Sequence, residues 1–219
     1  FSVGTAAIVM VGFSVTSMSL PLMFYLQLVH GLTPTQSALM LVPMAVASIV
    51  LARPVGLLID RRDPRRLPVI GLLGSAAGLM LYVFMSTPDI PVALLLIPSA
   101  VLGLGQAFMW GPLATLTTFN LEPKLAGAGS GVYNMSRQVG AVLGSAAMAV
   151  LMQARLTAHF GAQAASAHSF GESGAASQLP EAMREGFAAA MAQSILMPTV
   201  AVVLGAVISL FFVARPQKA

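Results

Sequence analysis

Cysteine is absent from the 219 residues, and charged side chains are scarce. Without a thiol the chain can form neither a disulfide nor a thiolate metal site. Charged residues make up 8% of the chain and hydrophobic residues 57%, whereas a soluble domain carries roughly a quarter charged residues. His30, His159 and His168 lie in or beside predicted loops without metal-ligand spacing, which indicates solvated side chains. The scarcity of charged residues predicts a membrane protein. The lack of cysteine and of ligand spacing among the histidines predicts no metal or cofactor.

Apolar runs of 18 or more residues recur along almost the whole chain, and each is long enough to cross about 30 Å of hydrocarbon as a helix. The runs lack the alternation of membrane β-strands, so helices are the remaining way to span a bilayer. We therefore predict an all-α polytopic membrane protein whose residues 1–219 form one six-helix transmembrane bundle. Turn and charge signals place the spans near residues 3–28, 37–58, 67–86, 92–119, 130–154 and 190–213. The long Ala/Ser/Gly-rich connector near 155–188 is predicted to be a mobile external loop.

Lysine and arginine gather on one side of this topology. The second and fourth connectors and the C-terminal tail hold most of them, and the other side keeps only Arg155 and Arg184. The positive-inside rule therefore makes both termini of the segment cytoplasmic, in a bacterial inner membrane. This topology also explains the pI near 10.1, so no nucleic-acid partner is expected. The chain enters an apolar helix at Phe1 without a signal-peptide n-region, which indicates a fragment of a longer protein.

The spans differ in polarity. The third and sixth carry almost nothing polar, whereas the other four carry hydroxyl, amide and charged groups, which predicts that these four line a wet cavity. In the fourth span Gln106 and Trp110 share a face, as suits a cavity wall that binds an amphipathic organic solute. The alternative is that Trp110 packs between helices with its N–H bonded to a carbonyl.

The fifth span places a permanent cation in an apolar run. Asn134, Arg137 and Gln138 lie on one helical stripe, which indicates that Arg137 faces an aqueous cavity or pairs with an acid such as Glu122 or Asp60. The alternative is a snorkelling side chain that reaches the headgroups. A second stripe of small residues, which includes the GxxxG pair Gly140 and Gly144, predicts close packing against another helix.

A basic turn joins the second and third spans. Gly56, Asp60, Arg61 and Arg62 could be a topology anchor alone, but their spacing resembles the G-x-x-x-D-R-x-G-R-R loop of the major facilitator superfamily. In that family the glycine permits close helix approach and the charged residues act as a conformational switch. Asp63 and Pro64 depart from the pattern.

A second motif narrows the resemblance. The AG-x-x-SG-x-x-N-x-x-RQ-x-G run from Ala126 to Gly140 is similar to the C-terminal half of 14-helix drug:proton antiporters of the EmrB/QacA-like branch, and to EfpA-type pumps in particular. The resemblance implies alternating access between two bundles, an N-terminal helical half as partner, a lipid surround, a small lipophilic substrate and a proton gradient as the energy source. It also implies that the third and sixth helices face lipid.

Three functions remain open on these residues. The first is proton-coupled efflux of lipophilic or cationic drugs. The second is transport of an endogenous lipid or lipid-like molecule, and the third is a structural half-bundle that transports nothing alone. An enzyme is not expected, because the sequence shows no nucleophile–base pair, paired carboxylates or phosphate loop.

Overall fold

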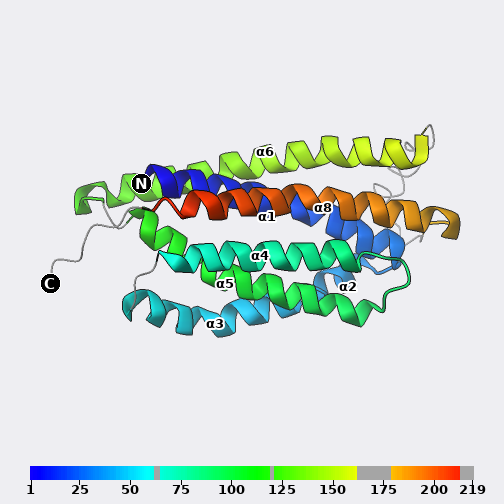
Figure 1. Cartoon of the computed structure of the whole chain (residues 1–219), viewed down its shortest axis with the longest axis horizontal. Coiled ribbons are helices and arrows are strands. Elements are labelled where there is room, and N and C mark those ends of the chain that lie inside the picture. Colours follow the sequence, from blue (N-terminus) through cyan, green and yellow to red (C-terminus); the bar gives the residue numbers. More distant parts are fainter. Residues whose placement is uncertain (62–64, 119–120, 162–178, 213–219) are drawn as a thin grey trace.

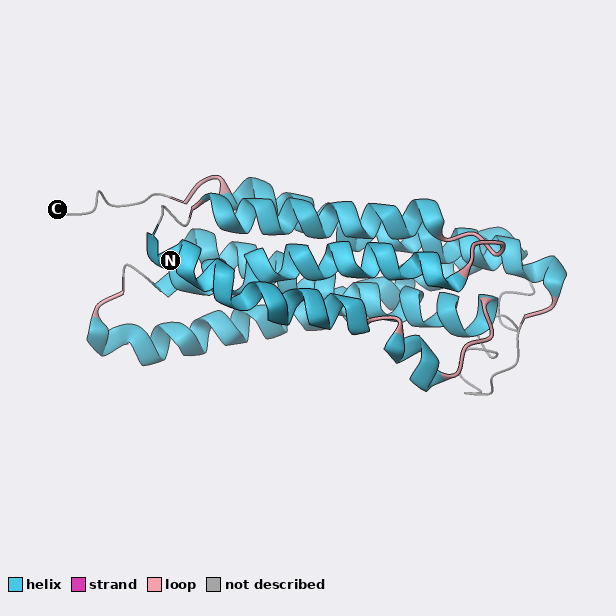
Figure 2. Cartoon of the chain, turned by 90° about the horizontal axis from the view of Figure 1, so that it is seen from below, coloured by secondary structure: helices cyan, strands magenta, loops and turns pink. Residues whose placement is uncertain are grey.

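The computed structural model describes residues 1–61, 65–118, 121–161 and 179–212, and in these ranges every regular element is helical (Figure 2). Six helical segments in the described ranges are long and apolar enough to cross a membrane, as an all-α polytopic bundle requires. The elements are α1 (Ser2–Phe24) with its π-helical continuation η1 (Tyr25–Val29), α2 (Pro34–Leu39), α3 (Val42–Arg61), α4 (Arg66–Met85), η2 (Val92–Leu95), α5 (Leu96–Thr118), η3 (Pro123–Leu125), α6 (Ala126–Phe160) and α8 (Glu181–Ser209).

The spans pack in an order that differs from the chain order. Helix α1 packs against α6 and α8, α8 continues to α4, and α4 packs against α5, which in turn carries α3. Figure 1 shows the result, with α6 along one long edge of the bundle and α3 along the opposite edge. The core lies between α1, α4, α5 and α8, and its fully buried side chains include Ile8, Tyr25, Leu72, Leu102 and Met191.

The two edge spans are the least covered. Only 6% of the most apolar stretch of Pro34–Ile59 is buried, and 28% of that of Ala126–Phe160. Large aliphatic side chains on both are exposed, among them Ile49 and Val50 of α3 and Val142 and Val150 of α6. These exposed faces require a cover of lipid or of another apolar surface, because water would not be tolerated over so much aliphatic area.

Helices α4 and α8, which form most of the predicted third and sixth spans, lie deeper in the bundle. Half of the α4 stretch and 56% of the α8 stretch are buried, so neither is a peripheral helix. Away from their charged first turns, the large side chains that they expose are apolar, namely Ile70, Leu73 and Phe84 of α4 and Leu196, Val200, Val203, Leu204 and Val207 of α8. These two helices therefore combine a core-facing side with an outer side of lipid-compatible composition.

The second span is interrupted, which the sequence interpretation of a continuous helix over 37–58 did not include. Helix α2 starts at a capping box between Thr33 and Gln36 and ends at Leu39, and a turn at Met40 and Leu41 precedes α3. Pro43 explains the break, because it lacks the N–H that would bond to the Leu39 carbonyl and its ring crowds that oxygen.

The predicted loop near 155–188 is shorter than expected at both ends. Helix α6 continues to Phe160, since no glycine or proline follows Gly144 until Gly161, which ends the helix with φ +54°. Helix α8 begins at Glu181 after Pro180 and ends at Ser209, four residues before the predicted end of the sixth span. Residues 162–178, the middle of the predicted loop, lie outside the described residues.

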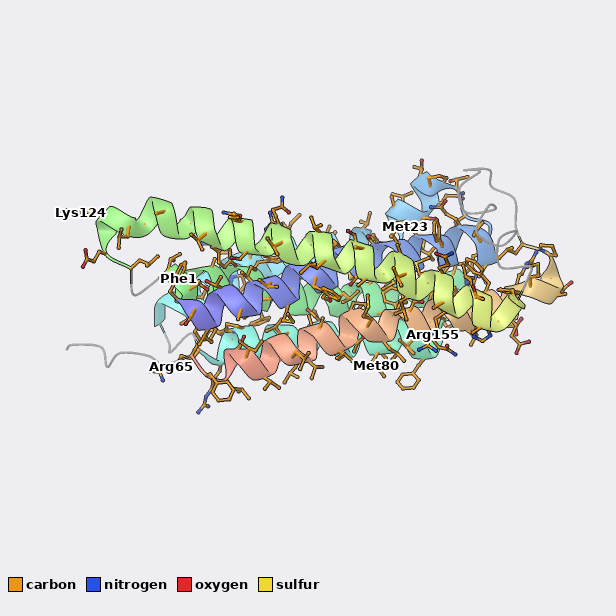
Figure 3. All side chains as sticks on the ribbon, turned by 90° about the horizontal axis from the view of Figure 1, so that it is seen from above. Phe1, Met23, Arg65, Met80, Lys124 and Arg155 are labelled. Carbon is orange, nitrogen blue, oxygen red and sulfur yellow. The ribbon has the colours of Figure 1, made fainter. Side chains whose placement is uncertain are left out.

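Basic residues lie toward both ends of the long axis of the bundle. Figure 3 shows Lys124 and Arg65 at the end where Phe1 lies, and Arg155 toward the opposite end. Because all six spans run nearly parallel to that axis (Figure 1), the two ends correspond to the two sides of a membrane.

Candidate functional site

Two glycines of α6 allow its backbone to touch the backbone of α1. A Cβ atom added at Gly140 would overlap the carbonyl oxygen of Val9, and one at Gly144 would overlap that of Phe13. From the other side, a Cβ at Gly12 would overlap the carbonyl oxygen of Arg137. The contact of these three glycines therefore fixes how close α6 lies to α1, and which face of α6 is turned toward α1, next to Arg137.

A hydroxyl group reinforces the glycine contact. The Thr16 hydroxyl of α1 donates to the carbonyl oxygen of Ala141 across the interface, over 2.9 Å. It also lies 2.9 Å from the carbonyl oxygen of Gly12 in its own helix. Both acceptors lie at hydrogen-bond distance from the same hydroxyl, so it links the two backbones in a three-centre arrangement.

A second close contact places α3 on α5. A Cβ at Gly103 would overlap the carbonyl oxygen of Met44, and the Ser48 hydroxyl donates to the Gly103 carbonyl over 3.0 Å. The contact brings the Met44 side chain to the same level as Gln106, one turn further along α5. Without a side chain at position 103 the two helices come close enough for these groups to meet.

Four side chains from three helices then form a contact chain. The Gln106 amide nitrogen lies 3.5 Å from the Met44 sulfur, and the Trp110 indole N–H donates to the Gln106 amide oxygen over 3.5 Å. The Arg137 guanidinium carbon lies 6.0 Å from the centroid of the Trp110 ring, in a cation–π contact. We call Met44, Gln106, Trp110 and Arg137 the α3–α5–α6 cluster.

The four side chains of the α3–α5–α6 cluster are all half-buried, and those of Gln106, Trp110 and Arg137 lie well inside the ends of their helices. Arg137 is about three turns into α6, roughly 16 Å from the first residue of that helix. At that depth the guanidinium contacts the face of the Trp110 ring, and the snorkelling alternative stays a prediction. The Trp110 N–H donates to a carbonyl oxygen, that of the Gln106 side chain, so this contact fits both the cavity wall and the alternative of a carbonyl-bonded indole.

Arg137 forms no ion pair with an acidic side chain among the described residues. Glu122, one of its two predicted local partners, is exposed at the end of the bundle. The other, Asp60, has a side chain outside the described part of the molecule. The guanidinium is half-buried, so its charge is partly removed from solvent without a described countercharge.

The remaining stripe residues of α6 do not join the cluster. Asn134 is exposed and donates to the carbonyl oxygen of Ser130 in its own helix over 3.0 Å, and Gln138 is exposed. Tyr133, which the sequence analysis did not single out, lies one turn before Arg137 and is 8% exposed. Its buried hydroxyl has no described hydrogen-bond partner. The i, i+4 spacing to Arg137 was the signal that could have found it.

The predicted switch loop is only partly described. Gly56 lies in α3, and a Cβ added there would have no described atom within 4 Å, so no helix of this bundle approaches it closely. The expected role of this glycine in close helix approach is therefore not fulfilled by any described contact of this chain. The side chains of Asp60 and Arg61, and Arg62 as a whole, lie outside the described residues.

A polar junction lies at the opposite end of the bundle. The Tyr25 hydroxyl donates to the Thr87 carbonyl over 2.9 Å, and the His30 ring nitrogen Nε2 lies 2.9 Å from the same hydroxyl. The two rings meet edge to face, with centroids 5.0 Å apart. His30 is thus half-buried, contrary to its reading as a solvated loop residue, and this burial lowers its pKa.

Comparison with known proteins finds one transporter family and several transport or resistance proteins. Residues 2–145 match the family model described as Major Facilitator Superfamily. The chain is 42% identical over 214 residues to an uncharacterized MFS-type transporter of Mycobacterium tuberculosis, covering 97% of this chain and 37% of that protein. It is 34% identical over 157 residues to the tetracenomycin C resistance and export protein of Streptomyces glaucescens, covering 71% and 29%. It is 35% identical over 133 residues to a puromycin resistance protein of Streptomyces alboniger, covering 57% and 25%. The chain thus spans about a third of the length of these relatives.

Proposed function

The chain belongs to the major facilitator superfamily, and we propose that it forms the C-terminal half of a proton-coupled exporter of lipophilic compounds, in the branch of 14-helix drug antiporters. The names of two relatives, a resistance and export protein and a resistance protein, support export as the direction of transport. The mechanism would be alternating access, in which two helical bundles rock about a central site.

The observation that carries this proposal is the α3–α5–α6 cluster, about three turns inside the bundle from its nearer end. A half-buried guanidinium over an indole that donates to an amide offers a flat apolar surface and several polar groups where a bilayer-spanning protein would otherwise have only aliphatic side chains. Ionisable groups at such depth are costly, and they mark substrate or ion pathways in membrane proteins.

The exposed apolar faces of the two edge helices favour the presence of a partner bundle. Helices α3 and α6 lie on opposite edges and expose aliphatic side chains such as Ile49 and Val142. An N-terminal helical half, as alternating access requires, would cover the parts of these faces that border the cluster, and lipid would cover the rest. The basic end that carries Lys124 and Arg65 would be cytoplasmic by the positive-inside rule.

An export assay on the full-length transporter tests the proposal. We expect Arg137→Ala to lower energised export of tetracenomycin C roughly ten- to hundred-fold, the effect of losing a hydrogen-bonding charged group. Arg155→Ala is the matched control, because it removes an exposed arginine at the far end of the same helix. Unchanged export by Arg137→Ala at equal membrane abundance would remove the cluster from the transport pathway.

Collapse of the proton gradient separates the proposal from lipid transport. Drug export should stop when a protonophore dissipates the gradient at constant ATP. Export that persists would contradict proton coupling. If the protein exports no drug at all but accelerates movement of a fluorescent phospholipid between leaflets of a proteoliposome, the lipid alternative holds instead.

A further inference from the structure

The α3–α5–α6 cluster is rich in hydrogen-bond donors and poor in acceptors. Arg137 brings five N–H groups and Gln106 a side-chain NH₂, whereas the only strong side-chain acceptor in the cluster is the Gln106 amide oxygen. That oxygen already receives the Trp110 indole N–H. The Gln106 nitrogen meets only the Met44 sulfur, which is a weak acceptor, at 3.5 Å.

Tyr133 adds a further donor next to the cluster. Its hydroxyl is buried, has no described partner and lies within electrostatic range of the Arg137 guanidinium. A buried O–H without an acceptor is costly, so such a group in a native structure calls for a missing partner. Neither Arg137 nor Tyr133 has an oxygen acceptor among the described residues, and the two lie one helical turn apart on α6.

The charge of the cluster disfavours a cationic ligand. The face of the Trp110 ring is already covered by the Arg137 guanidinium, so a ligand cation would have to displace it. At about 6 Å and an effective dielectric constant of about 20, repulsion between two unit cations weakens binding about a hundredfold. No described acidic side chain pairs with Arg137 to cancel this effect.

We propose that Arg137 and Tyr133 bind the anionic or hydrogen-bond-accepting group of an aromatic substrate, such as a carboxylate or phenolate, while its ring system packs beside Trp110. This assignment rests on the proposed function and replaces the broader expectation of cationic drugs. A planar aromatic acid satisfies all the observed groups at once, because its ring suits the indole and its oxygens suit the donors.

Two anthracene probes of opposite charge test the proposal in inverted membrane vesicles that contain the full-length transporter. The probes are 9-anthracenecarboxylate and 9-(trimethylammoniomethyl)anthracene, which share one ring system. We expect the wild type to transport the carboxylate at least tenfold faster than the ammonium compound, with tetracenomycin C as an independent substrate for the export activity itself.

Three variants distinguish a loss of carboxylate binding from a general loss of transport activity. Arg137→Gln should lower carboxylate transport at least tenfold and leave transport of the ammonium compound unchanged or higher. Tyr133→Phe, which keeps the ring and removes only the hydroxyl, should lower carboxylate transport about three- to tenfold and leave the ammonium compound unchanged. Arg155→Gln should change neither.

Some results would contradict the charge preference alone, and others would contradict the proposed function as well. Faster transport of the ammonium compound by the wild type, or equal losses of both probes in Arg137→Gln and Tyr133→Phe at equal membrane abundance, would overturn the charge preference and leave drug export standing. Such a result would indicate an acid from the partner bundle that neutralises Arg137. Absence of transport for both probes and for tetracenomycin C would overturn the proposed function together with this inference.

Discussion

Replacing Gly140 with alanine should force α6 away from α1 and destabilise the bundle. The new Cβ would overlap the carbonyl oxygen of Val9 and lie 2.9 Å from its carbonyl carbon and 3.0 Å from its Cα, whereas ordinary contact begins at 3.4 Å. These are backbone atoms, so no side-chain rotation can relieve the overlap. Overpacking of this kind costs about 1–3 kcal/mol, which the higher helix propensity of alanine offsets by up to about 1 kcal/mol.

Gly131→Ala on the same helix is the matched control. No atom lies within 4 Å of a Cβ added at Gly131, so this substitution should be neutral or stabilise by about 0.4–1 kcal/mol. Gly144→Ala should behave like Gly140→Ala, because its Cβ would overlap the Phe13 carbonyl oxygen. The double variant should lose less than the sum of the two, since one separation of the helices relieves both overlaps.

Thermal unfolding of the purified full-length protein, followed by circular dichroism at 222 nm, measures these differences. A change of 1 kcal/mol shifts the midpoint by about 2–4 °C in a domain of 150–250 residues and by less in a longer protein, so Gly140→Ala should melt measurably below the wild type. Equal midpoints for Gly140→Ala and Gly131→Ala would refute the glycine contact. A loss of carboxylate transport in Gly140→Ala beyond its loss of folded protein would show that the contact also sets the position of Arg137.

Two smaller perturbations test other polar contacts. Because burial lowers the pKa of His30, the neutral ring beside Tyr25 stabilises the fold above the ordinary histidine pKa of about 6.5, and this contribution is lost as the pH falls through the lowered pKa. The melting midpoint should therefore drop between pH 7 and pH 5, and less so in His30→Gln; equal drops in both proteins would exclude His30. Thr16→Val should cost about 0.6 kcal/mol through loss of its bond to Ala141, whereas Thr5→Val, which loses only a bond within its own helix turn, should cost less in the same melts, and equal midpoints would contradict a link across the interface.

Periodicity predicted the spans and the two faces of α6, because helix geometry alone decides which residues share a stripe. The number of apolar runs and the placement of Gly140 and Gly144 on one face were readable in this way. The positions of the helix ends were harder to predict from the sequence. The stretch after Arg155 is polar enough to read as a loop, yet without glycine or proline it continues as helix past the apolar segment.

The partners of the site residues could not be predicted, since periodicity does not say which helix lies opposite a stripe. The contact between Trp110 and Arg137 depends on α5 and α6 approaching one another, and α1 controls that approach through Gly12. Tyr133 was missed for the same reason. Its ring suits packing, and only the three-dimensional arrangement shows that its hydroxyl is buried without a partner.

The free energy of Arg137 explains why the α3–α5–α6 cluster is suited to a step in transport. Arg137 is half-buried and has no described acidic partner, so its partly desolvated charge is offset mainly by the cation–π contact with Trp110. The buried hydroxyl of Tyr133 also has no described acceptor. An acceptor that arrives only in one conformation, from a substrate or from the partner bundle, would satisfy both groups there. It would thereby favour that conformation, which is the differential binding that a switch between two states requires.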